Sequence, residues 1–120
     1  MDNTRTDIQE LARAMVDIVT DMKAEDIMLM DLREVTLIAD YFIICTGNSE
    51  RQLKAIVNRV QDEVREEFGK KVWRVEGDPS GGWVLLDYGD IVLHAFTEEQ
   101  REYYDLEGLW RDGKVLVHIQ

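Results

Sequence analysis

The sequence predicts an α/β protein, with a mixed sheet of about five or six strands flanked by helices. In three segments, a Ser or Thr followed three residues later by Gln precedes apolar residues at helical spacing, a pattern typical of a capped helix start. Between these segments lie short apolar or alternating runs, which are typical of strands. The length of 120 residues fits one domain, so we assign residues 1–120 to a single domain.

The first two predicted helices have the clearer apolar stripes. One follows Thr6 and continues to Met22, and the other follows Ser49 and continues to Phe68. Gly69 comes next, and glycine favours the left-handed exit at a helix end. At each of these helix starts we expect the Ser or Thr hydroxyl oxygen to accept a hydrogen bond from a free backbone N–H. The Gln side chain three residues later is expected to reach back to the start of the helix.

The third predicted helix follows Thr97 and is shorter. Its apolar positions are Tyr103, Leu106 and Trp110. Gly108 weakens it, because glycine is a poor helix former.

Strands are expected between and after the helices, at residues 27–32, 41–46, 72–75, 83–86, 91–96 and 115–119. The first two runs are almost entirely apolar, as in central strands that are covered on both faces. Asp87-Tyr88-Gly89-Asp90 reads as a hairpin turn, and Asp78–Gly82 as the most loop-like stretch. The role of the tail, residues 111–120, stays open.

The charge balance is strongly acidic. Against 14 basic residues stand 25 acidic ones, for a net charge of -11. Ten acids lie between Glu76 and Asp112, opposed only by Arg101 and Arg111, so this stretch carries -8 of the total. Such a surface disfavours general binding to nucleic acid and suits a basic partner. The plainer interpretation is a solvated acidic face that aids solubility.

Metal and export signals are not evident. One cysteine, Cys45, allows no internal disulfide, and with His94 and His118 it is too little for a Cys/His zinc cage. We expect Cys45 and His94 to be structural core residues. The N-terminus has no signal-peptide pattern, and no apolar run is long enough to cross a bilayer. We therefore expect a cytoplasmic protein without metal or cofactor.

The most enzyme-like feature is the turn Cys45-Thr46-Gly47-Asn48-Ser49, which leads from a strand into a helix. Such a turn can present backbone amides to a phosphate, as in nucleotidyltransferases. Those enzymes also need carboxylates that converge on metal ions, and no acid pair follows closely on a neighbouring strand. We interpret Ser49 as a helix cap and expect no catalytic residue.

Residues 83–88 combine apolar and acidic side chains. Alternation along a strand places Trp83, Leu85 and Asp87 on one face and Val84, Leu86 and Tyr88 on the other. If Val84 and Leu86 point inward, Trp83 lies outside beside a carboxylate, as an anchor for a basic partner does. The alternative is that Trp83 belongs to the core and Val84 faces out.

Several blocks resemble the ribosomal silencing factor family, also called Iojap-like. The central one is Asp40–Ser49 followed by Arg51. The others lie in the family's order and spacing over roughly residues 8–110: Glu76-Gly77, Trp83–Asp90, Val92 with His94, and Arg101, Tyr104, Leu106, Glu107, Leu109 and Trp110.

The resemblance implies a fold related to nucleotidyltransferases without their catalytic carboxylates. It also implies binding to the fourteenth protein of the large ribosomal subunit, on the face that meets the small subunit, so that joining is blocked and translation is repressed. It also implies a homodimer of the free protein. From the acidic charge and the lack of a long apolar run we expect no direct sequence-specific nucleic-acid binding and no membrane partner. The implied interface residues are Trp83, Leu85, Asp87, Tyr88, Gly89 and Asp90, with acids of the closing helix nearby.

Three functional hypotheses follow. The first is a non-enzymatic factor that prevents subunit association. The second is a nucleotidyltransferase-like enzyme that uses Gly47 and Ser49 to bind a nucleotide's phosphate. The third is a dimeric adaptor whose acidic face binds another basic protein.

Overall fold

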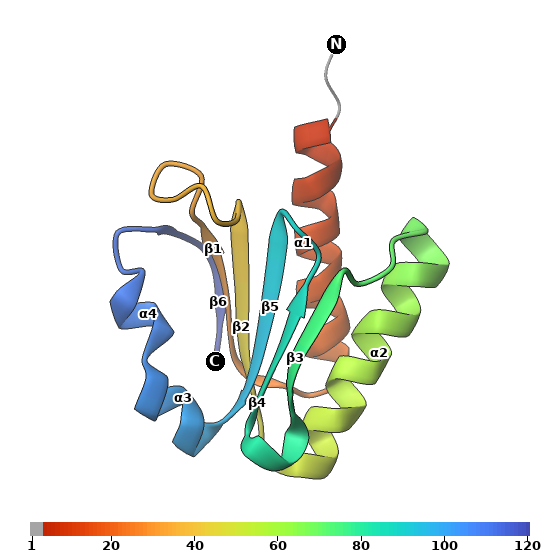
Figure 1. Cartoon of the computed structure of the whole chain (residues 1–120), viewed down its shortest axis with the longest axis vertical. Coiled ribbons are helices and arrows are strands. Elements are labelled where there is room, and N and C mark those ends of the chain that lie inside the picture. The colour runs from red at the N-terminus through yellow and green to blue at the C-terminus, as the bar shows by residue number, and fades with distance from the viewer. Residues whose placement is uncertain (1–3) are drawn as a thin grey trace.

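The computed structural model describes residues 4–120, and their side chains from residue 8 onward (Figure 1). Four helices, a short 3-10 turn and six strands follow in this order: α1 Thr4–Asp21, β1 Glu25–Asp31, β2 Tyr41–Gly47, α2 Glu50–Phe68, β3 Arg74–Asp78, η1 Pro79–Gly81, β4 Trp83–Asp87, β5 Ile91–Thr97, α3 Glu98–Tyr104, α4 Leu106–Leu109 and β6 Lys114–Ile119. The predicted α/β class is confirmed. None of the helices in this part of the chain has the length and hydrophobicity that crossing a bilayer requires.

The six strands form one mixed sheet in the order β3-β4-β5-β2-β1-β6. Only the central pair, β2 and β5, is parallel, and its register joins Ile44 to His94 and Thr46 to Phe96. All other neighbours are antiparallel. Every residue of β2 is buried, which confirms the prediction of a central strand from its continuous apolar run.

The two faces of the sheet are covered unequally. The long helices α1 and α2 lie on one face, and the short helices α3 and α4 lie on the other (Figure 1). The main hydrophobic core lies under α1 and α2 and includes Met15, Ile43 and Ile56. A smaller core under α3 and α4 contains Phe42, Phe96 and six other residues.

Both predicted ends of α2 are confirmed. Ser49 Oγ accepts a hydrogen bond from the backbone N–H of Gln52 at 3.1 Å, and Gln52 Oε1 accepts one from Asn48 N–H at 2.6 Å. The Gln52 amide also donates to the carbonyls of Met22 and Lys23, which ties this end to the segment after α1. At the other end, Gly69 is left-handed, with φ of 66°.

The predicted cap of α1 is wrong, and that of α3 is confirmed in position only. The helix α1 already includes Thr4, so Thr6 lies inside it and is not its cap. Thr97 stands at the start of α3 but makes no side-chain capping bond. The third helix is also not continuous, because Asp105 adopts a left-handed conformation with φ of 44°. Its carboxylate then caps α4 by accepting from Gly108 N–H at 3.2 Å.

Two strands differ from prediction by two or more residues at an end, and the predicted loop contains a short helical turn. The strand β3 begins two residues later than expected and continues to Asp78, because it pairs along the whole of β4. The strand β1 begins at Glu25, before the apolar run. The stretch predicted as loop contains η1, which begins at Pro79. The Asp78 side chain caps it by accepting a hydrogen bond from Ser80 N–H.

Candidate functional site

The strand β4 separates its side chains as the preferred interpretation predicted. Val84 and Leu86 are 2% and 0% exposed and belong to the main core. Trp83 and Leu85 lie on the other face, partly buried against the smaller core. The alternative orientation, with Val84 outside, is therefore wrong.

Three neighbours hold the Trp83 indole. Its ring stacks on Phe96, with centroids 5.0 Å apart and planes inclined by 24°, and contacts Tyr104 at 4.5 Å. Its Nε1–H donates a hydrogen bond to His94 Nδ1 at 3.2 Å. These three neighbours come from elements that follow β4 in the chain: His94 and Phe96 lie on β5, and Tyr104 lies on α3.

A hollow of about 250 Å³ opens beside Trp83, lined by Glu76, Gly77, Trp83 and Leu85. Two tyrosines of α3 adjoin it through the Trp83–Tyr104 and Tyr103–Tyr104 ring contacts. Tyr103 is 77% exposed and Tyr104 is 45% exposed. We call these six residues together the Trp83 surface.

The tyrosines are not expected at this surface from the sequence. The apolar spacing predicts Tyr103 on the apolar side of a continuous helix, together with Leu106 and Trp110. Because α3 ends at Tyr104, Tyr103 leaves that side and faces solvent. The signal that would have found it is Asp105, a residue type that tolerates left-handed backbone and caps helices.

The hairpin turn after β4 gives its four predicted residues different environments. Asp87 is 8% exposed, and its carboxylate accepts from Gly89 N–H at 2.7 Å and lies 3.4 Å from Arg74 Nη2. Tyr88 packs against the main core on the opposite face from Trp83, and burial raises the pKa of its hydroxyl to about 12. Gly89 and Asp90 are exposed at the tip.

The expectation that Asp87 presents its charge to solvent is therefore wrong. Its carboxylate shapes the turn, with Gly89 at φ of 91°. The exposed acids beside the Trp83 surface come instead from β3, because the register places Glu76 next to Leu85 and Asp78 next to Trp83. Of the ten acids between residues 76 and 112, eight are exposed, and only Asp87 and Glu107 are not.

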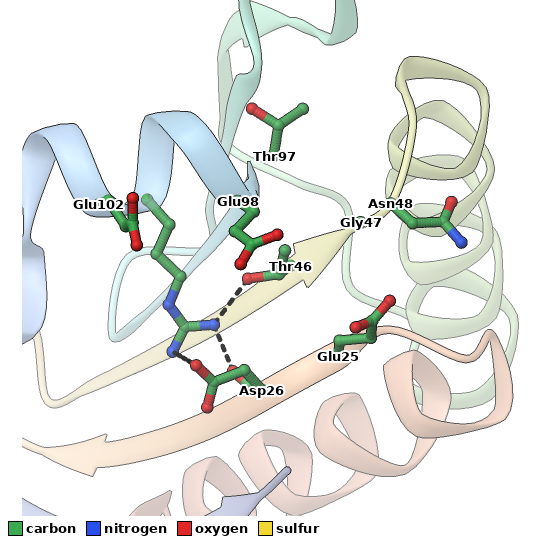
Figure 2. Close-up of a pocket in the computed structure, with 9 residues that line it drawn as sticks. Glu25, Asp26, Thr46, Gly47, Asn48, Thr97, Glu98 and Glu102 are labelled. Carbon is green, nitrogen blue, oxygen red and sulfur yellow. Dashed lines mark hydrogen bonds and ion pairs between the residues drawn. The ribbon is translucent and has the colours of Figure 1, made fainter.

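A hollow of about 310 Å³ lies at the C-terminal ends of the parallel strands β2 and β5 (Figure 2). The helices that follow these strands leave toward opposite faces (Figure 1), and ligands of open α/β sheets often bind where the chain diverges in this way. The hollow is lined by Glu25, Asp26, Thr46, Gly47, Asn48, Thr97, Glu98, Arg101 and Glu102. Four of these nine residues are acidic and only one is basic, so the hollow disfavours a phosphate.

The turn before α2 is also occupied by its own contacts. Ser49 caps the helix, and the N–H of Asn48 donates to the Gln52 side chain. The enzyme hypothesis assigned phosphate binding to Gly47 and Ser49, and of these two Ser49 already serves as the helix cap. No group of three or more His, Cys, Asp or Glu side chains among the described residues is placed to hold a metal ion.

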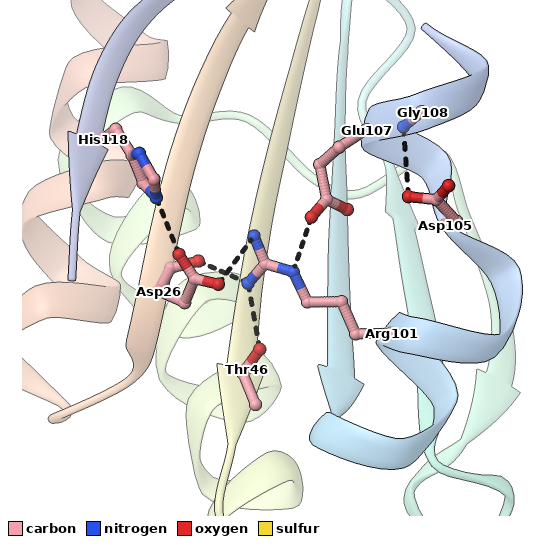
Figure 3. A network of polar contacts seen from close by, with 7 residues as sticks. All are labelled: Asp26, Thr46, Arg101, Asp105, Glu107, Gly108 and His118. Atoms are coloured by element: carbon pink, nitrogen blue, oxygen red, sulfur yellow. Dashed lines mark hydrogen bonds and ion pairs between the residues drawn. The ribbon is translucent and has the colours of Figure 1, made fainter. Parts of the chain in front are cut away.

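The one cation of this hollow, Arg101, is buried in a network of its own (Figure 3). Its Nη1 donates to the backbone carbonyl of Asp26 and, at 2.9 Å, to Thr46 Oγ1. Its Nε donates to Glu107 Oε2 at 3.1 Å, and Asp26 Oδ1 lies 2.7 Å from His118 Nε2. The network therefore joins β1, β2, α3, α4 and β6, and it holds the two short helices on the sheet.

Comparison with known proteins agrees with these features. A family model described as "Ribosomal silencing factor during starvation" matches residues 5–120. A ribosomal silencing factor of Halalkalibacterium halodurans is 44% identical over 105 residues, which cover 88% of this chain and 89% of that protein. The chloroplastic Iojap protein of Zea mays is 34% identical over 97 residues, covering 80% of this chain and 41% of its own length.

Solved structures give the same result. A crystal structure of a Chromobacterium violaceum protein has a TM-score of 0.82 at 39% identity and covers 87% of this chain and 86% of that one. One from Bacillus halodurans has a TM-score of 0.74 at 42% identity, covering 85% and 94%. The chain, with its six-stranded mixed sheet, thus belongs to the family of ribosomal silencing factors.

Proposed function

We propose that this protein binds the large ribosomal subunit through that subunit's fourteenth protein and so blocks joining of the small subunit. The observation that carries the proposal is the Trp83 surface, where a partly exposed indole, a leucine and two exposed tyrosines lie beside the acids of β3. Tryptophan and tyrosine are enriched among the residues that contribute most to protein–protein binding. The relatives are named ribosomal silencing factors, and this name supports a ribosomal partner for the surface.

Electrostatics supports a basic partner for this surface. Glu76 and Asp78 flank Leu85 and Trp83 on the sheet, and Asp90 is exposed at the tip of the hairpin. Ribosomal proteins are generally basic, so opposite charges steer the two surfaces together, and salt slows their association. Within the proposed interface, Trp83 and Leu85 supply apolar contact. Asp87 and Gly89 fix the turn that presents Asp90, and Tyr88 supports it from the opposite face.

Bulk is sufficient for the proposed effect. The molecule measures 44 × 33 × 24 Å, and a body of this size on the joining face keeps the second subunit at a distance. No chemical step is needed, and translation is lowered because fewer complete ribosomes form. In a bacterial cell, the proposed site of action is the cytoplasm, where the ribosomal subunits are.

The free protein is proposed to form a homodimer through the same surface. Pairing would cover apolar side chains that are otherwise in contact with water. Sedimentation equilibrium tests this idea, since Trp83→Ala should shift the protein toward monomer while the change Phe68→Ala, on α2, should not.

The decisive experiment is sedimentation of purified subunits with and without the protein. We expect the wild type to reduce the fraction of joined ribosomes in a dose-dependent way. Trp83→Ala should weaken binding to the large subunit by about 2 kcal/mol, or roughly 30-fold, the size of an interface hot spot. Undiminished joining at saturating protein would contradict the proposed function.

Matched variants separate the surface from general effects. Asp90→Lys and Glu76→Lys should weaken binding, most strongly at low salt. Asp17→Lys makes the same charge change at an exposed position of α1, on the opposite face, and should bind nearly as wild type. If all three charge variants lose affinity equally, net charge and not this surface determines binding.

A further inference from the structure

We propose that His94 is a positioning residue for Trp83: it accepts the indole N–H at Nδ1 and so presets the ring that meets the partner. This inference rests on the proposed function. It concerns one atom pair, Trp83 Nε1 and His94 Nδ1, 3.2 Å apart.

The hydrogen bond fixes the protonation of the histidine. An indole N–H can only donate, so Nδ1 must carry a lone pair and the proton must be on Nε2. His94 is 4% exposed, and Nε2 has no hydrogen-bond partner among the described residues. The neutral tautomer with hydrogen on Nε2 is therefore the one present, and burial keeps it neutral by lowering the pKa.

Stability alone does not favour histidine at this position. The ring lies among apolar side chains, 4.6 Å from Phe42 in an edge-to-face contact, and its buried N–H without an acceptor carries a desolvation cost. An aromatic ring without a polar atom would avoid that cost. The distinctive contribution of His94 is its bond to Trp83.

The bond adds a directional contact to a ring that its aromatic neighbours hold by packing alone. Phe96 and Tyr104 pack on the indole, and such contacts allow the ring to slide in its plane. A directional bond at Nε1 removes that freedom before the partner arrives, and ordering a side chain in advance lowers the entropic cost of binding. It also means that the indole N–H is satisfied internally, so Trp83 meets the partner through its apolar surface.

Two substitutions separate the bond from the ring. His94→Phe keeps an aromatic ring and removes the acceptor, whereas His94→Asn loses the ring but places an amide oxygen where Nδ1 stands. Val92→Ala is the matched control, since Val92 lies on the same strand and in the same small core. Circular dichroism and thermal unfolding establish that each variant is folded before binding is measured.

The expected results concern spectra and affinity together. In the wild type, a long-range proton–nitrogen spectrum should show His94 with hydrogen on Nε2 only. His94→Phe should shift the Trp83 indole N–H resonance upfield and speed its exchange with water. It should also weaken binding to the large subunit about tenfold, the factor expected for one lost hydrogen bond. His94→Asn should restore most of the indole shift and part of the affinity, and Val92→Ala should leave both nearly unchanged.

Each contrary result has a distinct meaning. If the wild type does not bind the large subunit, the proposed function fails and this inference fails with it. If the wild type binds and Trp83→Ala binds equally well, the surface is misassigned, and the role of His94 falls too. If Trp83→Ala weakens binding but folded His94→Phe binds as wild type, only the positioning role is overturned. A wild-type spectrum with hydrogen on His94 Nδ1 overturns it without any variant.

Discussion

Lowering the pH from about 7 to about 5 should reduce the free energy of unfolding by about 2 kcal/mol through one side chain, His94. Burial lowers the pKa of His94 to about 3, whereas a histidine in the unfolded chain titrates near its ordinary value of about 6.5. Between these two values the unfolded state binds a proton that the native state does not. The contribution is fully present above about pH 6.5 and is lost as the pH falls toward about 3.

The magnitude follows from this difference in proton binding. Each pH unit inside the window changes the free energy of unfolding by about 1.4 kcal/mol, and about one and a half units of the window lie between pH 6.5 and 5. Most carboxylates keep their charge in this range, and comparison with His94→Asn leaves His118 unchanged in both proteins. In the native state the imidazole is buried, and protonating Nδ1 would also replace the bond from Trp83 with a repulsive pair of donors.

Urea unfolding at a series of pH values, followed by circular dichroism, measures this effect. The matched protein is His94→Asn, which retains His118 and all carboxylates but cannot titrate at position 94. As the pH is lowered, the free energy of unfolding should fall more steeply for the wild type than for the variant. Parallel curves between about pH 7 and 5 would refute the reasoning, because they would mean that His94 takes up its proton in both states or in neither.

Three further outcomes are expected. Arg101→Ala should cost about 3 kcal/mol of stability because it leaves charged partners of a buried network unpaired, whereas Arg59→Ala, which breaks an exposed pair on α2, should cost under about 0.5 kcal/mol; equal losses in urea unfolding would contradict this. Gly77→Ala should cost about 2 kcal/mol more than Gly69→Ala, since both glycines have positive φ but only at the first would the new Cβ lie 2.2 Å from a carbonyl oxygen of β4. Cys45, whose thiol pKa burial raises to about 12, should resist thiol reagents in the native protein at about pH 8 and react after unfolding; rapid native labelling would disprove its burial.

Local signals in the sequence predicted the elements well. The continuous apolar run 41–46 gave the central strand, and Ser49 and Gly69 marked both ends of α2, because their effects depend on neighbouring residues only. The boundary of β3 was less predictable, since its residues are all exposed and pairing with β4 determines its length. Asp105 was missed because a left-handed residue inside an apparently helical pattern leaves the spacing of apolar residues unchanged.

The orientation of Trp83 in the candidate site was predictable from the sequence, but the contacts of Asp87 and Arg101 were not. Alternation in residues 83–88 correctly separated Trp83 from Val84, because a strand has only two faces. The burial of Asp87 depends on Arg74, thirteen positions away. The Arg101 network joins residues 26, 46, 101, 107 and 118. No periodicity in a single sequence encodes such long-range contacts, which arise from the order of the strands.

The position of the Trp83 surface follows from the chain's topology. Helices of 18 and 19 residues cover one face of the sheet, whereas the other face receives helices of only 7 and 4 residues. These short helices cover the strands near the centre, because α3 continues directly from β5 and Arg101 ties it to β1 and β2. The strand β4 is linked to its neighbours β3 and β5 by tight turns, which bring no helix over its outer face. Trp83 and Leu85 therefore remain partly accessible, so the same arrangement that completes the core of this small protein also leaves an apolar surface for a partner.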